Sequence, residues 1–212
     1  AIVQDGYLGS EAGNSLADVL VGDVNPSGKL PFTFPVAYED GPLKTVEQYP
    51  GVDQGRTGGV EAYDVPIFEM TYSEGVFVGY RWYDTKNIKP LFAFGHGLSY
   101  TRFEYGSVSC RVKKGTVTVK VPVTNIGDVA GAEVVQVYVR DCEASVEMPN
   151  KQLKGFDKVY LEPGQTKTVE ICLDQDAFRF FDEQTMSWKT EPGDFEILVC
   201  ASSDDVRGSS II

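Results

Sequence analysis

The stretch TVTVKVPVTNIGDVAGAEVVQVYV, residues 116–139, alternates apolar and polar side chains on both sides of a turn-like sequence. Valines recur at every second position in two sets: Val117, Val119, Val121 and Val123, then Val135, Val137 and Val139. Successive strand residues point to opposite faces, so this spacing predicts strands with one buried face and one solvated face. Such half-buried strands, joined by a turn at Asn125–Asp128, are typical of antiparallel sheet.

The same alternation continues toward the end of the chain, in residues 169–173 and 195–199. Two Glu-Pro-Gly turns, Glu162–Gln165 and Glu191–Asp194, have Pro and Gly where a type II turn requires them. About seven short strands over roughly 110 residues match the size of an immunoglobulin-like sandwich. The Cys…Trp…Cys pattern of antibody domains is missing, so we predict a fibronectin III-like sandwich over residues 103–212.

The first 22 residues predict a strand followed by a helix. AIVQ is typical of the middle of a buried strand, so Ala1–Val3 should form a strand end. A helix should begin at Ser10 or Glu11 and end at Gly22 as its C′ residue. Its apolar face would consist of Leu16, Val19 and Leu20.

A turn at Asn25–Gly28 and an extended run at Leu30–Phe34 complete this first unit. Pro31 and Pro35 exclude a helix there. One strand and one helix cannot bury their own apolar faces, so they need companion elements. We therefore expect residues 1–35 to be the C-terminal fragment of an α/β sandwich domain.

Residues 36–102 are expected to be a linker, a wrapping loop and a junction. Gly and Pro residues interrupt any regular element between residues 36 and 71, among them Pro42, Pro50, Gly51, Gly55, Gly58, Gly59 and Pro66. A loop of this length is either a solvated linker or a functional segment, and we favour one that wraps over another surface. Residues 72–102 are dense in glycine and aromatic residues.

Composition excludes several classes of partner. The net charge is -12 and the pI is about 4.5, which argues against binding of nucleic acid or anionic membranes. No apolar run has the length of a membrane span, and the N-terminus lacks the basic and apolar regions of a signal peptide. The sequence leaves open a periplasmic, secreted or cytoplasmic bacterial location.

The cysteines and the only histidine do not indicate a metal site or a cofactor. A zinc site needs ligands close together in the fold, usually as closely spaced pairs in the sequence. Four cysteines lie far apart in this sequence, and His96 is the only histidine, so a zinc site is not expected. The cysteines are Cys110, Cys142, Cys172 and Cys200. We expect free, mostly buried thiols, with a disulfide as the alternative. Because His96 lies between two glycines, we expect it to be held in a tight turn by backbone hydrogen bonds.

No residue of this chain is predicted to be catalytic. Hydrolysis of a glycoside needs two carboxyl groups, and the candidates all have structural explanations. Glu74 could contact a ligand, but we expect it to pair with Arg81. The candidates are Glu11, Asp18, Asp23, Glu74 and Asp84.

Aromatic residues of the junction could stack on sugars, but their spacing favours packing between domains: Tyr72, Phe77, Tyr80, Trp82 and Tyr83.

Three blocks of sequence resemble family 3 glycoside hydrolases, the β-glucosidase and β-xylosidase group. GSEAGNSLADVLVGDVNPSGKLPFTFP, residues 9–35, resembles the end of that family's α/β sandwich domain. YSEGVFVGYRWYD and PLFAFGHGLSYTRFEY, residues 72–84 and 90–105, resemble the passage into the next domain. AGAEVVQVYVRD, residues 130–141, with residues 151–169 and 191–207, resembles the fibronectin III-like domain.

The resemblance implies a retaining hydrolase of β-linked glycosides that uses no cofactor and no metal. The family's nucleophile is an aspartate on a barrel domain, and its acid/base is usually a glutamate ahead of the block that matches residues 9–35. Neither position matches a residue here, and Glu11 matches a structural Gly-x-Glu-x-Gly motif. The implied partners are the missing barrel and α/β domains, and a β-linked oligosaccharide or aryl glycoside.

We therefore predict the accessory C-terminal part of a β-glycosidase, which braces the catalytic domains. Its long loop would reach the aglycone side of the substrate through Tyr49, Tyr63, Phe68 and Tyr72. One alternative is a stand-alone carbohydrate-binding or adhesion module without catalysis, which would need an exposed planar array of aromatic rings. Another is a structural domain of an inactive enzyme. Whether the protein forms a homo-oligomer is left open.

Overall fold

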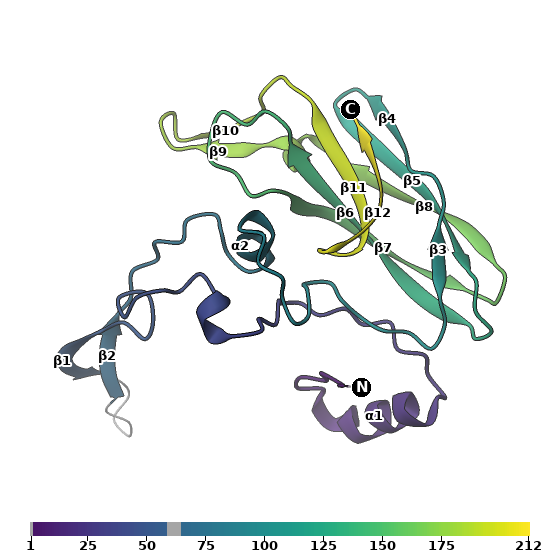
Figure 1. Ribbon diagram of the computed structural model, residues 1–212, viewed down its shortest axis with the longest axis horizontal. Helices are drawn as coiled ribbons and strands as arrows, with labels where there is room; N and C mark the ends of the chain where they lie inside the picture. Colours follow the sequence, from purple (N-terminus) through teal and green to yellow (C-terminus); the bar gives the residue numbers. More distant parts are fainter. Residues whose placement is uncertain (1, 59–64) are drawn as a thin grey trace.

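The computed structural model describes residues 2–58 and 65–212. Figure 1 shows a β-sandwich with two further parts on one side of it: an N-terminal segment with helix α1, and an arm that ends in the hairpin β1–β2. The mainly β fold and the antiparallel sandwich agree with the prediction.

Two antiparallel sheets form the sandwich. The first has the order β12–β11–β6–β7, built from Asp205–Ile211, Phe195–Ser202, Gly131–Asp141 and Gln152–Leu161. In the second, β5 (Thr116–Asn125) pairs with β3 (Phe103–Tyr105), β4 (Ser109–Lys113) and β8 (Thr166–Leu173). A small hairpin, β9 (Phe180–Asp182) with β10 (Ser187–Lys189), follows the short helix η3 (Gln175–Phe178).

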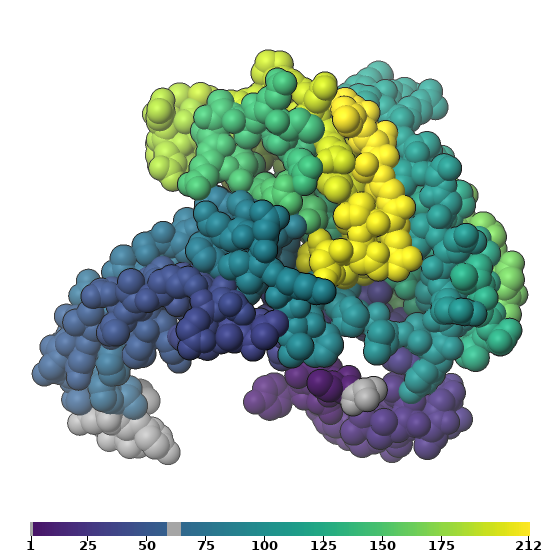
Figure 2. Space-filling model, in the orientation of Figure 1, coloured from purple at the N-terminus to yellow at the C-terminus, as the bar shows by residue number. Residues whose placement is uncertain are grey.

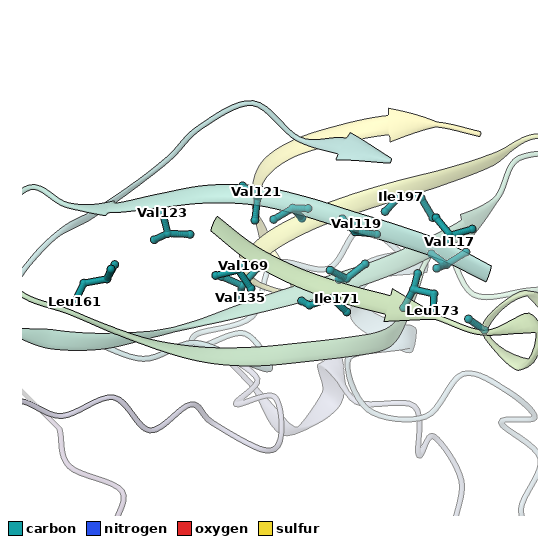
Figure 3. Packing of buried hydrophobic residues seen from close by; sticks show 14 residues of the cluster. Val117, Val119, Val121, Val123, Val135, Leu161, Val169, Ile171, Leu173 and Ile197 are labelled. Atoms are coloured by element: carbon teal, nitrogen blue, oxygen red, sulfur yellow. The ribbon is translucent and has the colours of Figure 1, made fainter. Parts of the chain in front are cut away.

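The core of the sandwich lies between the two sheets and is made of the alternating residues. Val121 faces Val169 across the β5–β8 pair, and Val137 faces Val199 across the β6–β11 pair. Figure 3 shows the buried side chains of this cluster pointing toward one another from both sheets. The valine alternation therefore identified the buried face of each strand correctly.

The two Glu-Pro-Gly sequences behave differently. At Glu162–Gln165 the predicted turn is present: Gly164 has a φ of 74°, and the Gln165 N–H donates to Glu162 O at 2.9 Å. The type II turn predicted at Glu191–Asp194 is wrong, since Gly193 has a φ of 156°. There, the Glu191 carboxylate accepts from Ser145 N–H at 3.0 Å, which holds the segment against a neighbouring loop.

The predicted N-terminal helix is present. After a turn of 3-10 helix, η1 (Gly9–Glu11), helix α1 spans Ala12–Val21 and ends at Gly22, whose φ is 90°. The strand predicted at Ala1–Val3 is wrong for the residues that the structure describes, because Ile2 and Val3 are exposed and not in a strand. Ile2 and Val3 have no neighbouring strand whose backbone could hydrogen-bond to them among the described residues, so they do not form a strand. Ala1 lies outside the described residues.

The extended run at Leu30–Phe34 is confirmed only in part, since the chain bends at Pro31 and Phe32, but both ends of the run pair with the junction. Phe34 N–H donates to Phe92 O, and Leu30 N–H donates to His96 O, each at 2.8 Å. These bonds tie the N-terminal segment to residues 92–96, about sixty positions later in the chain.

The arm, residues 36–71, is not the continuous loop that its glycines and prolines predicted. It contains the 3-10 helix η2 (Tyr38–Asp40) and the antiparallel hairpin of β1 (Val52–Gly58) with β2 (Val65–Glu69). Gly55 has a φ of 64° and lies where the register between the strands shifts. The glycine therefore marks a bulge in a strand and does not end it.

Candidate functional site

Helix α2 (Tyr80–Thr85), which the sequence reading did not predict, fastens the junction to the outer face of the first sheet. The ring of Tyr80 stacks on Phe94 with centroids 4.8 Å apart and meets Tyr138 edge to face at 5.7 Å. The Tyr80 hydroxyl also accepts a hydrogen bond from Leu153 N–H at 2.7 Å. Tyr138 is fully buried, and its burial raises the pKa of its hydroxyl.

An ion pair strengthens the same contact. Lys151 Nζ lies 2.5 Å from Asp84 Oδ1, and the Lys151 side chain is only 5% exposed. Asn150 Nδ2 donates to the second Asp84 oxygen at 3.0 Å, and Asn150 N–H donates to Thr85 Oγ1 at 2.9 Å. Asp84 is thus fully engaged in holding α2 on the sandwich, which agrees with a structural role for this carboxylate.

A buried glutamine forms a third connection. Gln136 Nε2 donates to Gly95 O at 3.1 Å and to Ala201 O at 2.8 Å, while its Oε1 accepts from Tyr138 Oη at 2.8 Å. Gly95 has a φ of 78°, and a Cβ at this position would overlap the Gln136 amide. Only glycine fits so close to this side chain.

The N-terminal segment is attached to the sandwich through Lys29. Its ammonium lies 2.9 Å from Glu133 Oε1, and the same oxygen accepts from Tyr105 Oη at 3.1 Å. Burial, and then the charge of Glu133, raise the pKa of the Tyr105 hydroxyl. The three side chains form a buried network at one end of the core.

Asn25, after α1, makes a second attachment. The turn predicted at Asn25–Gly28 is wrong, since these residues form neither a turn nor a bend, and the Asn25 side chain bonds to distant residues instead. Its Oδ1 accepts from Ser99 Oγ at 2.9 Å and from Tyr100 N–H at 2.8 Å, and its Nδ2 donates to Ala130 O at 2.9 Å. One side chain therefore bridges the N-terminal segment, the junction and the sandwich.

His96 has the structural role that its two flanking glycines predicted. Its N–H donates to Ala93 O at 3.1 Å, its O accepts from Leu30 N–H, and its ring stacks on Phe92 at 5.7 Å. The imidazole therefore packs in a turn that holds the strand-like pairing of residues 30–34.

The predicted pairing of Glu74 with Arg81 is wrong. Over the part of the chain that the structure describes, Glu74 makes no ion pair, and its buried Oε2 has no hydrogen-bond partner. Gly75 and Gly79 have φ values of 61° and 60°, so the backbone turns between Glu74 and α2 and separates the two side chains. Arg81 instead lies close enough to Lys154 to lower its pKa, a smaller cause than the burial of that lysine.

The aromatic residues of the junction mostly pack inside, as expected. Phe77 and Tyr83 are each 7% exposed, and Trp82 Nε1 donates to Asp40 O at 2.8 Å. Tyr72 is the exception, since it is 78% exposed.

The four cysteines are free thiols, but the prediction that most are buried is wrong. Cys142 and Cys172 are exposed, Cys110 is half-buried, and only Cys200 is fully buried. Cys172 alternates with the inward Ile171 and therefore lies on the solvent face of β8. Burial raises the pKa of Cys200 to about 12.

The predicted substrate contacts lie on or next to the arm. Tyr49 and Phe68 are 56% and 44% exposed, Tyr72 follows the hairpin, and Tyr63 lies outside the described residues. An isolated two-stranded hairpin is marginally stable in water. All residues of β1 and β2 are exposed or half-buried.

Helix α1 is equally uncovered. None of its residues is buried against the described part of the chain, and Leu20 and Val21 are 64% and 70% exposed. Figure 2 shows the arm and helix α1 on one side of the sandwich, with open space between the arm and the helix. Both parts thus present apolar side chains that nothing in the described residues covers.

The Trp and Tyr side chains of the sandwich do not form one exposed array, although Phe156 and Tyr160 are both exposed on β7, and Phe181 lies 5.6 Å from Trp188 in the β9–β10 hairpin. Tyr138 is buried, while Tyr160 on β7 and Trp188 on β10 are exposed on strands that do not pair with each other. Within residues 2–58 and 65–212, no group of three or more His, Cys, Asp or Glu side chains is placed to hold a metal ion. No described helix is long and apolar enough to cross a membrane.

Comparison with known families gives two matches. The Glycosyl hydrolase family 3 C-terminal domain matches residues 1–80, and the Fibronectin type III-like domain matches residues 133–203. The two together define the C-terminal region of a glycoside hydrolase. The chain belongs to this region of the family 3 enzymes, as the three sequence blocks indicated.

Individual relatives give the same result. The chain is 47% identical over 209 residues to thermostable beta-glucosidase B of Acetivibrio thermocellus, covering 96% of this chain and 26% of the relative. It is 45% identical to beta-glucosidase BoGH3A of Bacteroides ovatus, covering 99% of this chain and 27% of the relative. The chain therefore spans about a quarter of the length of these curated relatives.

Solved structures match in fold as well. DesR, a beta-glucosidase from Streptomyces venezuelae in complex with D-glucose, matches with a TM-score of 0.84 and 40% identity, over 95% of this chain and 24% of that chain. The GH3 beta-glucosidase of Bifidobacterium adolescentis matches with a TM-score of 0.84 and 37% identity, over 97% and 28%.

Proposed function

We propose that this chain is the accessory C-terminal part of a retaining β-glucosidase that hydrolyses β-linked glycosides. The observation that carries the proposal is the contrast between a closed sandwich and an uncovered helix and arm, in a chain that spans about a quarter of its relatives. In this proposal the barrel and the rest of the α/β domain cover α1 and the arm.

The proposal divides the chain into three functional parts. Residues 1–35 complete the α/β domain, residues 36–102 wrap over the catalytic domains and form the junction, and residues 103–212 are the bracing sandwich. The Lys29–Glu133 and Asp84–Lys151 pairs support this division, because they fix the first two parts to the third.

Both catalytic carboxyl groups lie outside this chain in the proposal. The carboxylate of the candidate Asp84 already forms an ion pair with Lys151. The carboxylate of the candidate Glu11 is exposed at the start of α1, where it accepts a hydrogen bond from Asn14 Nδ2 at 2.6 Å. Retaining hydrolysis needs two carboxyl groups about 5–5.5 Å apart on either side of the scissile bond.

Assays of hydrolysis test this assignment directly. The 212-residue chain is incubated with aryl β-glucoside and aryl β-xyloside, and the intact mass of the sample is measured to detect any companion chain. We expect no turnover from a single species of the chain's own mass. Turnover by that single species would overturn the assignment of catalysis to another part of the enzyme.

The exposed aromatic residues of the arm are proposed to contact the aglycone of the substrate. Tyr49, Phe68 and Tyr72 offer apolar ring faces to an aryl or sugar group, and Tyr63 lies in the same segment. In the full-length enzyme, Tyr72→Ala should change the ratio of kcat/KM between aryl glucoside and cellobiose by at least about threefold. Trp188→Ala, which removes another largely exposed ring, from the sandwich, is the matched control. Equal ratios for the two variants and the unmodified enzyme would reject the contact.

A further inference from the structure

A cavity of about 420 Å³ lies where three segments of the chain meet. The extended residues 30–34, α2 with the loop that follows it, and the turn between β11 and β12 form its walls. Its polar lining includes Thr33, Asp84, Asn87, Lys89, Ser203 and Asp204. Its volume falls within the roughly 300–1,000 Å³ typical of small-molecule sites.

Backbone hydrogen bonds preform these walls. Ser203 N–H donates to Phe94 O at 2.9 Å, and Ile88 N–H donates to Tyr83 O at 2.8 Å. Asn87 has a φ of 54°, a conformation that asparagine adopts more readily than most residues. The cavity is therefore part of the latched junction and needs little ordering before a ligand enters.

Several polar groups at the cavity have no partner among the described residues. Within residues 2–58 and 65–212, no hydrogen bond or ion pair is made by the side chains of Asn87 and Lys89, which are exposed at the rim, or by that of Ser203, which is 6% exposed. Thr33 Oγ1 is buried there and likewise has no partner among these residues. An unpaired buried polar atom costs stability, so a ligand that hydrogen-bonds to Thr33 Oγ1 would remove that cost.

The charges around the cavity are balanced. Asp84 is already neutralised by Lys151, which leaves Asp204 and Lys89 as one carboxylate and one ammonium. A charged ligand would therefore gain little here. Asn87 and Ser203 can each donate and accept hydrogen bonds, as sugar hydroxyls also do, and the buried ring of Tyr83 adds an apolar wall.

We propose that this cavity binds a neutral monosaccharide or disaccharide. The choice of a sugar over another neutral polyhydroxyl compound rests on the proposed function. The existence of the site rests on the cavity and its unpartnered groups alone.

Titration of the ¹⁵N-labelled 212-residue chain with D-glucose, and separately with cellobiose, tests the site by two-dimensional NMR. We expect saturable shifts of the Asn87, Lys89 and Ser203 amide signals, with a dissociation constant in the millimolar range. Asn87→Gly keeps the positive φ but removes the amide side chain, and should weaken binding at least about fivefold. Lys89→Met provides a second variant that preserves the length of the side chain.

Lys114→Gly is the matched control, because Lys114 also has a positive φ, of 51°, but lies in the turn between β4 and β5. It should bind as the unmodified chain does. The proposal would be overturned by shifts that do not saturate or by shifts confined to other parts of the chain. It would also be overturned if Asn87→Gly and Lys89→Met both bound the sugar as tightly as the unmodified chain. This outcome is distinct from a failure of the proposed function, which is read from turnover and not from binding.

Discussion

The sandwich and the two parts beside it contain equally regular secondary structure but bury very different amounts of it. Fourteen hydrophobic side chains close the sandwich core, among them Val123, Val135 and Ile197, which are fully buried. Helix α1 and the hairpin β1–β2 bury none of their described residues. Most helical stability in proteins comes from tertiary packing, so regular geometry alone does not make a segment self-sufficient.

The junction stands between these extremes. It has no large core of its own, but Tyr80, Asp84 and Gly95 attach it to the sandwich through stacking, an ion pair and a close backbone approach. The comparison therefore predicts three levels of stability: a robust sandwich, a latched junction and a weakly held helix and arm.

Truncation of one apolar side chain in each region should give the largest contrast. Ile197→Ala removes a fully buried side chain and should lower the free energy of unfolding by about 2–5 kcal/mol, since a cavity remains. Leu20→Ala, on exposed α1, should change it by less than about 0.5 kcal/mol. Urea unfolding followed by fluorescence measures both. Similar losses for the two variants would mean that α1 shares the core.

A methyl group added at a glycine tests the latch. Gly95→Ala and Gly164→Ala both place alanine at a positive φ, which costs about 1–2 kcal/mol in each case. Only at Gly95 does the new Cβ also meet a buried side chain, Gln136, so about 1–3 kcal/mol is added there. Equal stabilities of the two variants would show that the contact between Gly95 and Gln136 is loose.

Removal of one charge from an ion pair separates buried from exposed pairs. Lys151→Met leaves Asp84 partly buried without its cation and should cost about 1–3 kcal/mol. Lys120→Met breaks the exposed pair with Glu170 on the sandwich surface and should cost at most about 0.5 kcal/mol. Thermal unfolding provides the measurement. A Lys151→Met variant as stable as the unmodified chain would show that this ion pair does not hold the junction on the sandwich.

The sandwich should lose stability at alkaline pH. The pKa of Cys200 is raised from 9.0 to about 12 by burial, so the folded state keeps the thiol neutral while the unfolded chain ionises it. Stability from this group is full below pH 9 and is lost as the pH rises toward 12, about 1.5 kcal/mol being lost at pH 10. Cys200→Ala should flatten the fall between pH 8 and pH 10 in urea titrations. If the variant lost stability between pH 8 and pH 10 as steeply as the unmodified chain, the loss would come from groups other than Cys200.

Much of the sandwich could be predicted from the sequence because period-two alternation reports directly which face is buried. Val117 to Val123 and their partners in β6, β8 and β11 were all identified in this way. Gly22 likewise marked the end of α1, since its positive φ is a local requirement.

Features that depend on distant contacts could not be predicted. The spacing of Tyr80 and Tyr83 is compatible with a helix face, but six residues are too few for a helical signal without the Lys151 and Leu153 contacts. The hairpin β1–β2 was hidden because Gly55 indicated a break in regular structure, whereas it forms a bulge. The exposure of Cys142 depends on where β6 ends, which the composition of the strand does not fix.

The central claim is that the sandwich folds by itself, whereas α1 and the arm require the rest of the enzyme. Amide hydrogen exchange of the isolated 212-residue chain, followed by mass spectrometry of its peptides, tests it directly. We predict slow exchange in β5, β6, β8 and β11, intermediate exchange in α2, and fast exchange in α1 and β1–β2. Protection of α1 and β1–β2 equal to that of the sandwich would contradict the account.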